Sequence, residues 1–531
     1  MTQNAQGPGE DGSVRCLARF PGAPETFLEP SLQIRFGYNP RSVASAHPTQ
    51  QIAKAPETPV QPRLWREWRF LLFLSLVLLP CLWQSRIQAG DLSSHLYNSW
   101  LALQIRSGAI HGVSIVPQWT NVAFDWLLTW LLASFGAALA QRIAISLAVL
   151  VFAGGAFVFI ASASGRRPWF LTPCVAVLAY GFAFHIGFFN FYFSLGICLW
   201  FLAAFWNGGI WQRTAALLLL PLAWLAHPLP VVWGVGSVAY LTLARRMAAK
   251  WRLLLLLIAI AALVVLHQLL SGRYHTVWSP MQVFGVTGAD QVFVYGRKYG
   301  IVLVGLLLLW LVWLRRLLKS SGRDLILQIP AQLFVLTAAG VVLIPSRIDF
   351  PRYGHALVYV ADRMSLVAGV LLCVVLAKLR VRRAELVALA AVSLTFFGFL
   401  YADSAWANRR EDEIEALVKH DIQPGARVVF YAPDRNMRLD PLAHVVDRAC
   451  LGYCFSYADY EPSTRQFRIR ADENNGIVVT SYNDVYQIAT GNYVVRTQDI
   501  PLFQVEKCSP GAQQYCVREL RAGQVNGQHT N

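Results

Sequence analysis

The sequence predicts an all-α polytopic bundle of transmembrane helices, with about 11–13 spans, followed by a small C-terminal domain of α/β or α+β type. Of the 531 residues, 55% are hydrophobic and only 14% are charged, against about 25% charged residues in soluble domains. Segments such as 253–270 and 301–314 lie in apolar runs close to the roughly 20 residues that cross a bilayer. After residue 402 these runs give way to short alternating segments.

The N-terminal region differs from the rest of the chain. Residues 1–62 are rich in Pro, Gly, Ala, Gln and Ser and lack apolar periodicity, which predicts a disordered cytoplasmic tail. The first apolar stretch begins near Trp68, too late for a cleavable signal peptide, so we expect it to be an uncleaved signal anchor. Residues 63–402 then form the predicted transmembrane domain, with an outer loop at 84–121.

Apolar runs separated by short loops define the candidate spans. They lie at about 68–86, 122–140, 143–163, 169–185, 190–207, 213–227, 229–244, 253–270, 299–317, 326–345, 364–379 and 384–402.

Basic clusters between these spans predict the topology. The net charge of +16 therefore indicates cytoplasmic loops near anionic lipid rather than nucleic-acid binding. The clusters are Arg63/Arg66/Arg69, Arg245/Arg246/Lys250/Arg252, Arg315/Arg316/Lys319/Arg323 and Lys378/Arg380/Arg382/Arg383. They place the N-terminus inside, and loops 271–298 and 346–363 and everything after residue 402 outside.

The candidate spans are even in number. An even number of crossings leaves both termini on the same side of the membrane, which conflicts with an inside N-terminus and an outside C-terminus. Because His227-Pro228 interrupts the run 213–244, we expect one broken helix there and eleven crossings. That count puts Arg166 and Arg167 outside, against the positive-inside rule. A non-crossing segment within 122–163 is the alternative, and thirteen crossings is the other consistent count.

Residues 403–531 predict a soluble extracytoplasmic domain. EDEIEALVKH has a helical pattern, and RVVFYA, FRIRA, GIVVTS, NYVVRT and LFQVEK are short β-type runs. The domain holds Cys450, Cys454, Cys508 and Cys516. In an oxidising compartment these predict two disulfides, and we favour the pairs that are close in sequence, Cys450–Cys454 and Cys508–Cys516.

The outer loop reads GDLSSHLYNSWLALQIRSG and places Asp91 and His95 four residues apart. In a helix that begins at Asp91, both side chains lie on one face. A carboxylate and an imidazole at the lipid–water boundary are costly to keep, which makes them candidates for chemistry. The structural alternatives are an N-cap for Asp91 and a water-bonded interfacial residue for His95.

This arrangement resembles the GT-C glycosyltransferases: a first span, an outward loop opening with an acid and a helix, many spans, and an outward C-terminal domain. The resemblance covers the architecture of residues 68–531 and the Asp-Leu-Ser-Ser-His-Leu stretch. It implies a polyprenyl-phosphate-linked sugar as donor, an extracytoplasmic acceptor, and Asp91 as general base or metal-associated carboxylate. His95 would orient Asp91 or the acceptor. The loop lacks the adjacent Asp-Glu pair of the protein mannosyltransferases, so the metal is unknown and a divalent ion stays open.

Such a donor needs cations for its phosphate, and the outer loop SRIDFPRYGHALVYVADRM supplies Arg347, Arg352, His355 and Arg363. Arginine suits this task because its guanidinium forks onto phosphate oxygens. Excess positive charge on an outer loop also runs against the positive-inside pattern. The alternative is an ion pair with Asp349 or Asp362, or contact with lipid headgroups.

Three further polar residues lie at span ends: His185, Asn190 and His227. They are functional candidates at membrane depth, although a histidine at a span end more often bonds a helix terminus. No P-loop, Rossmann glycine pattern, HExxH or GxSxG motif is present, so cytoplasmic nucleotide chemistry is unsupported.

The sequence thus predicts a membrane glycosyltransferase, in a bacterial inner membrane, whose acceptor is a glycolipid, glycan or protein. A non-enzymatic membrane protein, either a transporter or an envelope-assembly component, is the rival. An O-antigen-ligase-like transferase is the third alternative, and it would make His355 and Arg352 primary.

Overall fold

The computed structural model describes the chain outside residues 1–66, 351–354, 433–436, 465, 510 and 529–531. The predicted tail, residues 1–62, and the predicted phosphate ligand Arg352 lie outside the described residues.

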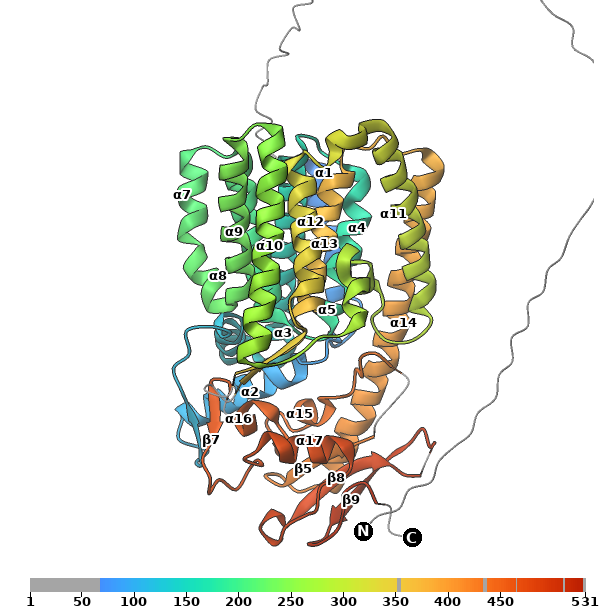
Figure 1. Cartoon of the computed structure of the whole chain (residues 1–531). Helices are drawn as coiled ribbons and strands as arrows, with labels where there is room; N and C mark the ends of the chain where they lie inside the picture. Colours follow the sequence, from blue (N-terminus) through green and yellow to red (C-terminus); the bar gives the residue numbers. More distant parts are fainter. Residues whose placement is uncertain (1–66, 351–354, 433–436, 465, 510, 529–531) are drawn as a thin grey trace, which may run out of the picture. The chain divides into compact units, whose positions relative to one another are not determined.

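Apolar α-helices form a bundle that fills the upper part of Figure 1. Those of the bundle are α1 (Trp68–Val77), α3 (Ala123–Ser164), α4 (Thr172–Ala179), α5 (Phe182–His185), α6 (Phe189–Asn207), α7 (Ile210–Leu218), α8 (Leu220–Ala226), α9 (Pro228–Arg245), α10 (Ala249–Arg273), α11 (Tyr299–Ser321), α12 (Ile329–Leu343), α13 (Val360–Leu376) and α14 (Arg383–Asp421). Five helices in the described part are long and apolar enough to cross a membrane, by length and composition.

The surface of the bundle is itself apolar. Along α10 only Leu256 is buried, while Leu257, Ile258 and Leu269 are each more than half exposed. A water-soluble protein does not expose a contiguous apolar surface of this size. The chain is therefore a helical protein of the membrane type.

The predicted spans 122–140 and 143–163 are one helix, α3, bent at Gly136. This glycine has φ 73° and ψ 169°, a conformation that is essentially restricted to glycine. Before the bend, Asp125 contacts His95; just after it, Arg142 donates to the carbonyl oxygens of Gln84 and Ser85. Residues on both sides of the bend thus contact the segment 84–95, which places the bend at one end of the bundle.

The expectation of one broken helix across 213–244 is wrong. Pro228 lacks the N–H that would continue α8, and His227 is extended, with φ −165° and ψ 129°. The chain turns there, and α9 packs against both α8 and α6. The interruption that was expected here lies instead within 122–163, the alternative position.

At the other end of the bundle, the Arg166 side chain donates to the Lys378 carbonyl oxygen at 2.9 Å, and Arg316 donates to that of Arg380 at 2.7 Å. The segments around Arg166, Arg316 and Lys378 therefore share one end of the bundle, so Arg166 lies with these basic segments rather than on the opposite side.

Helix α2 (Leu92–Arg106) lies across the lower end of the bundle, between it and the C-terminal strands (Figure 1). The loop that follows contains β1 (Val113–Ile115), which pairs antiparallel with β7 (Ile469–Ala471) of the C-terminal region. Nearby, β2 (His275–Val277), β3 (Arg347–Phe350) and β4 (His355–Leu357) form a three-stranded antiparallel sheet.

The C-terminal domain is built on a mixed sheet of order β6-β5-β8-β9. Strand β5 (Arg427–Tyr431) runs parallel to β6 (Phe455–Ser456) and β8 (Leu502–Lys507), and β9 (Tyr515–Leu520) is antiparallel to β8. Helices α15 (Val445–Ala449), α16 (Tyr460–Thr464) and α17 (Tyr482–Thr490) complete it. Helix α14 enters this domain without a break at residue 402.

Three of the predicted strands are absent from this sheet, and one of them, FRIRA, forms β7, which pairs with β1 instead. The run GIVVTS at 476–481 forms no strand, although Val478 and Val479 are buried, and NYVVRT makes only a bridge between Val494 and Val525. Both predicted disulfides are present. The Cα atoms are 4.4 Å apart in Cys450–Cys454 and 5.0 Å apart in Cys508–Cys516.

Candidate functional site

Asp91 lies at the start of α2, where the bundle meets the C-terminal domain. Its backbone N–H donates to the Ile186 carbonyl oxygen at 3.1 Å, and the Gly90 N–H donates to that of His185 at 2.6 Å. Gly187, at φ 96°, lies so close that a Cβ there would be 2.6 Å from the Asp91 nitrogen. The close approach of this glycine fixes the position of Asp91 on the bundle.

The Asp91 side chain does not cap α2. Asp91 occupies the N-cap position, but its side chain makes no capping hydrogen bond. One carboxylate oxygen, Oδ1, instead lies 3.4 Å from Nε2 of His444. The two side chains are 27% and 22% exposed, so the pair is accessible from outside.

His444 is a site residue that the sequence did not reveal. It precedes α15, and its Nδ1 lies 2.9 Å from Asp447 Oδ2. The other Asp447 oxygen accepts a 2.5 Å hydrogen bond from the Ser456 hydroxyl in β6. The His-x-x-Asp spacing just before Cys450 was a weak signal for this pair, because nothing in it points to Asp91.

The electrostatics favour an imidazolium at His444. Burial lowers the pKa of His444, but the hydrogen bonds and charges of Asp447 and Asp91 outweigh burial, and the pKa is raised well above its usual value. The site therefore holds a cation between two carboxylates.

Arg363 is a predicted phosphate ligand whose charge interacts with that of Asp91. Its guanidinium stacks 4.0 Å from the centre of the Phe188 ring, and Phe188 directly follows Gly187. The Arg363 Nε is buried and makes no hydrogen bond with any residue that the structure describes. Asp91 and Asp362 are the carboxylates that act on its charge.

The carboxylates that could have neutralised Arg363 have other partners. Asp362 pairs with Arg438 of the C-terminal domain at 3.0 Å, and the Arg438 guanidinium stacks 3.7 Å from the ring centre of Phe182. Asp349 accepts a 2.7 Å bond from Arg347. The buried Arg363 Nε therefore makes no hydrogen bond to the residues that the structure describes, whereas the predicted ligand Arg347 is part of a surface ion pair.

The predicted ligand His355 lies in β4, where it is paired with Phe350 of β3. Only its backbone position is described. The described residues thus bring Arg363, out of the predicted phosphate ligands, into the vicinity of Asp91.

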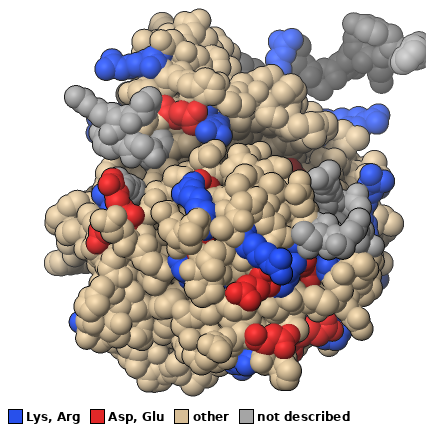
Figure 2. Space-filling view, turned by 90° about the horizontal axis from the view of Figure 1, so that it is seen from below, with Lys and Arg blue, Asp and Glu red and all other residues tan. Residues whose placement is uncertain are grey.

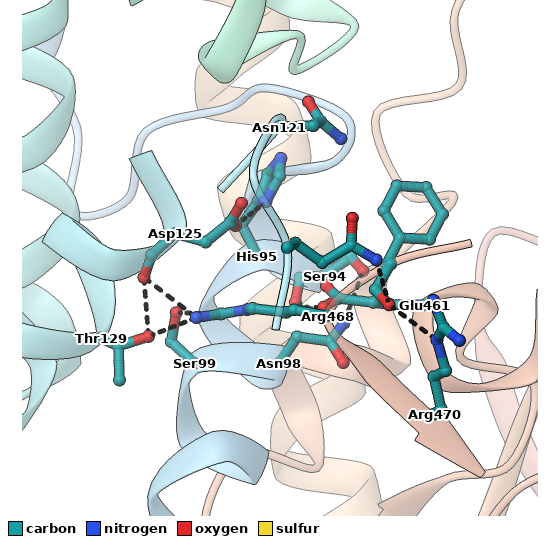
Figure 3. Close-up of polar contacts among 12 residues, drawn as sticks. Ser94, His95, Asn98, Ser99, Asn121, Asp125, Thr129, Glu461, Arg468 and Arg470 are labelled. Atoms are coloured by element: carbon teal, nitrogen blue, oxygen red, sulfur yellow. Dashed lines mark hydrogen bonds and ion pairs between the residues drawn. The ribbon is translucent and has the colours of Figure 1, made fainter. Parts of the chain in front are cut away.

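His95 was expected to orient Asp91 or the acceptor, but in the described part of the chain its ring bonds Asp125 rather than Asp91 (Figure 3). His95 Nδ1 bonds Asp125 Oδ1 at 2.6 Å, and the Asn190 amide donates to Asp125 Oδ2 at 2.8 Å. Burial lowers the pKa of His95, but the Asp125 carboxylate outweighs burial and the net pKa is raised. The i, i+4 spacing of Asp91 and His95 predicted that they share a helix face. It could not predict that His95 would pair with Asp125, which lies on α3.

Arg468 joins the C-terminal domain to this network (Figure 3). Its guanidinium donates to the hydroxyls of Thr129 at 2.9 Å and Ser99 at 3.2 Å, and its Nε lies 3.5 Å from Glu461 Oε1. Burial, opposed chiefly by Arg468, raises the pKa of Glu461 to about 7. These contacts hold α2 and α3 against the domain.

The remaining polar candidates have structural partners. His185 Nδ1 lies 3.0 Å from the Gln88 carbonyl oxygen and 2.9 Å from the Tyr295 hydroxyl. His227 accepts a bond from the Leu229 N–H at 3.2 Å and so caps α9. His227 therefore matches the helix-terminus interpretation, whereas His185 bonds a loop carbonyl oxygen and a tyrosine hydroxyl.

Among the residues that the structure describes, no group of three or more His, Cys, Asp or Glu side chains is placed to hold a metal ion. Comparison with protein-family models, with curated proteins and with solved structures found no match to this chain.

Proposed function

We propose that this protein is a membrane-embedded glycosyltransferase that moves a sugar from a polyprenyl phosphate to an acceptor hydroxyl on the side of the C-terminal domain. The observation that carries the proposal is that the accessible carboxylate of Asp91 acts on the charge of Arg363, whose Nε makes no hydrogen bond among the described residues. A base and a phosphate ligand are the two groups that this reaction requires.

The chemistry follows from these groups. Asp91 takes the proton from the acceptor hydroxyl, and the acceptor oxygen bonds the anomeric carbon. The bond from that carbon to the phosphate oxygen breaks, and the electron pair leaves with the polyprenyl phosphate. Arg363, with the imidazolium of His444 nearby, offsets the negative charge that develops on the phosphate.

The charge distribution on the surface of the C-terminal domain is consistent with phosphate binding at a buried residue, Arg363, rather than on that surface. Acidic and basic side chains are interspersed across this face (Figure 2), so it offers no broad field of one sign for a phosphate. The lipid donor would instead enter from the bilayer, along the apolar bundle, and present its headgroup at Arg363.

The orientation is part of the proposal. Eleven passes (α1, α3, α4–α5, α6, α7–α8, α9, α10, α11, α12, α13 and α14) would place the basic loops in the cytoplasm and Asp91 outside. A periplasm-active reporter fused after Asn531 is expected to be active. Activity of a cytoplasm-active reporter at that position would invert the topology and remove the site from its substrates.

Donor turnover tests the function directly. Purified protein in nanodiscs is incubated with a panel of undecaprenyl-phosphate-linked hexoses and pentoses and a membrane lipid extract as acceptor. We expect release of undecaprenyl phosphate from at least one donor, detected by mass spectrometry. An absence of release from every donor would favour the rival, a transporter or an envelope-assembly component.

A further inference from the structure

We infer that His444 of the C-terminal domain is a positioning residue that holds the Asp91 carboxylate and thereby completes the site. This inference rests on the proposed function, since it assigns a role in that same site. Asp91 belongs to the outer loop and His444 to a different domain, so the two meet only because the domain packs on α2. The contact is direct, 3.4 Å between Asp91 Oδ1 and His444 Nε2.

The histidine is held from behind by a fixed chain of partners. Asp447 bonds Nδ1 at 2.9 Å, and Ser456 bonds Asp447 in turn. Asp447 and Ser456 are 3% and 4% exposed. The Tyr460 ring packs beside the imidazole, with 5.4 Å between ring centres.

The Cys450–Cys454 disulfide links the two segments that carry Asp447 and Ser456. Cys450 ends α15, which carries Asp447, and Cys454 directly precedes β6, which carries Ser456. A histidine whose far nitrogen is fixed in this way has one ring orientation and one donor directed at Asp91. The support therefore resembles that of a histidine oriented by a buried carboxylate, as in hydrolytic triads.

The geometry gives the pair a specific task. A carboxylate attached through a single Cβ rotates freely about its terminal torsion. The ion pair to Oδ1 fixes that rotation and leaves Oδ2 to accept the acceptor proton. Loss of the histidine therefore lowers the fraction of base in the reactive orientation, which reduces kcat more than it changes KM.

Removing the histidine also changes the charge balance. In His444→Gln, Asp91 and Asp447 face one another without the cation that separates them, and like charges repel. In the wild-type background, Asp91→Asn removes the ion pair with His444 and should lower Tm, by roughly 1–3 °C for a chain of this size. In the His444→Gln background, Asp91→Asn should leave Tm unchanged or raise it.

The experiment is a double-mutant cycle in Tm combined with kinetics on the full chain, with the undecaprenyl-phosphate sugar that turns over fastest as probe. We expect kcat to fall roughly 10-fold in His444→Gln with KM changed less than about twofold, and to fall further in His444→Ala. Glutamine retains a donor, so it should partly rescue the alanine variant. His420→Gln is the matched control, because His420 also bonds a carboxylate, that of Asp421, but is 87% exposed.

Additive Tm changes, or an unchanged kcat in both His444 variants, would overturn the inference about His444. If the wild-type protein still turned over a donor, the proposed function would remain supported. Wild-type protein without turnover on any donor would instead overturn the proposed function, and with it the role of the pair in transfer.

Discussion

Transfer by Asp91→Asn is expected to be at least about 100-fold slower than by the wild type, the low end of general-base effects. The amide cannot accept the acceptor proton, yet it has nearly the shape of the carboxylate and remains able to cap a helix. The Asp91 side chain forms no cap in the structure, so folding should survive. The measurement is release of undecaprenyl phosphate at saturating donor.

Asp412→Asn is the matched control for Asp91→Asn. Like Asp91, Asp412 pairs with a cationic side chain, that of Arg86 at 2.8 Å, but it is 61% exposed and lies on α14. The same chemical change there should alter turnover less than twofold, since exposed pairs contribute little. Full activity of Asp91→Asn would refute the base assignment and transfer the hypothesis to Arg352 and His355.

Loss of Arg468 is expected to cause the largest change in stability. In Arg468→Met the Glu461 carboxylate stays buried without its partner, and the two side chains are only 4% and 6% exposed. Breaking a buried pair from one side costs about 3–5 kcal/mol. We expect a loss of that size in the free energy of unfolding, measured by titration with sodium dodecyl sulfate in mixed micelles.

The pH dependence of this loss has a definite sign. The pKa of Glu461 is raised to about 7 by burial even with Arg468 present, and removal of Arg468 raises it further. A carboxyl with a raised pKa in the folded state contributes stability below its unfolded pKa and loses it as pH rises through the folded value. The defect of Arg468→Met should thus be smaller at pH 5 than at pH 8.

Arg470→Met, two residues further along the chain in β7, provides the control. Arg470 donates only a 3.5 Å bond to the Phe467 carbonyl oxygen, so its loss should cost less than about 0.5 kcal/mol. Equal losses for Arg468→Met and Arg470→Met would contradict the role of the buried network. Partial recovery in Arg468→Met/Glu461→Gln would identify the unpaired carboxylate as the cause.

The sequence predicted the bundle well because apolar length and basic loops are local signals. It did not distinguish a crossing from a surface segment, since residues 123–135 are as apolar as a span. The bend depends on the backbone of Gly136, and sequence composition does not report the conformation of a glycine. The turn at His227-Pro228 was visible, but not that the chain reverses there.

The part of the candidate site that comes from neighbouring residues in the sequence was predictable. Asp91 stood out because an acid directly follows the first span, and the cysteine pairs because they are close in sequence. His444 and Arg468 could not be found in the same way, because each acts on residues of the outer loop that the chain reaches only after folding. That the Arg363 Nε makes no hydrogen bond within the described residues depends on which carboxylates Arg347 and Arg438 occupy, and those pairings form only in the folded chain.

The central claim is that Asp91 and Arg363 form one site for a lipid-linked phosphate. A cryo-EM structure of Asp91→Asn in nanodiscs with undecaprenyl phosphate tests it most directly. We predict phosphate density within hydrogen-bond distance of the Arg363 guanidinium, about 3 Å, with residue 91 facing the same space. Phosphate density at the basic end of the bundle, beside Arg316 and Lys378, with none at Arg363, would contradict it.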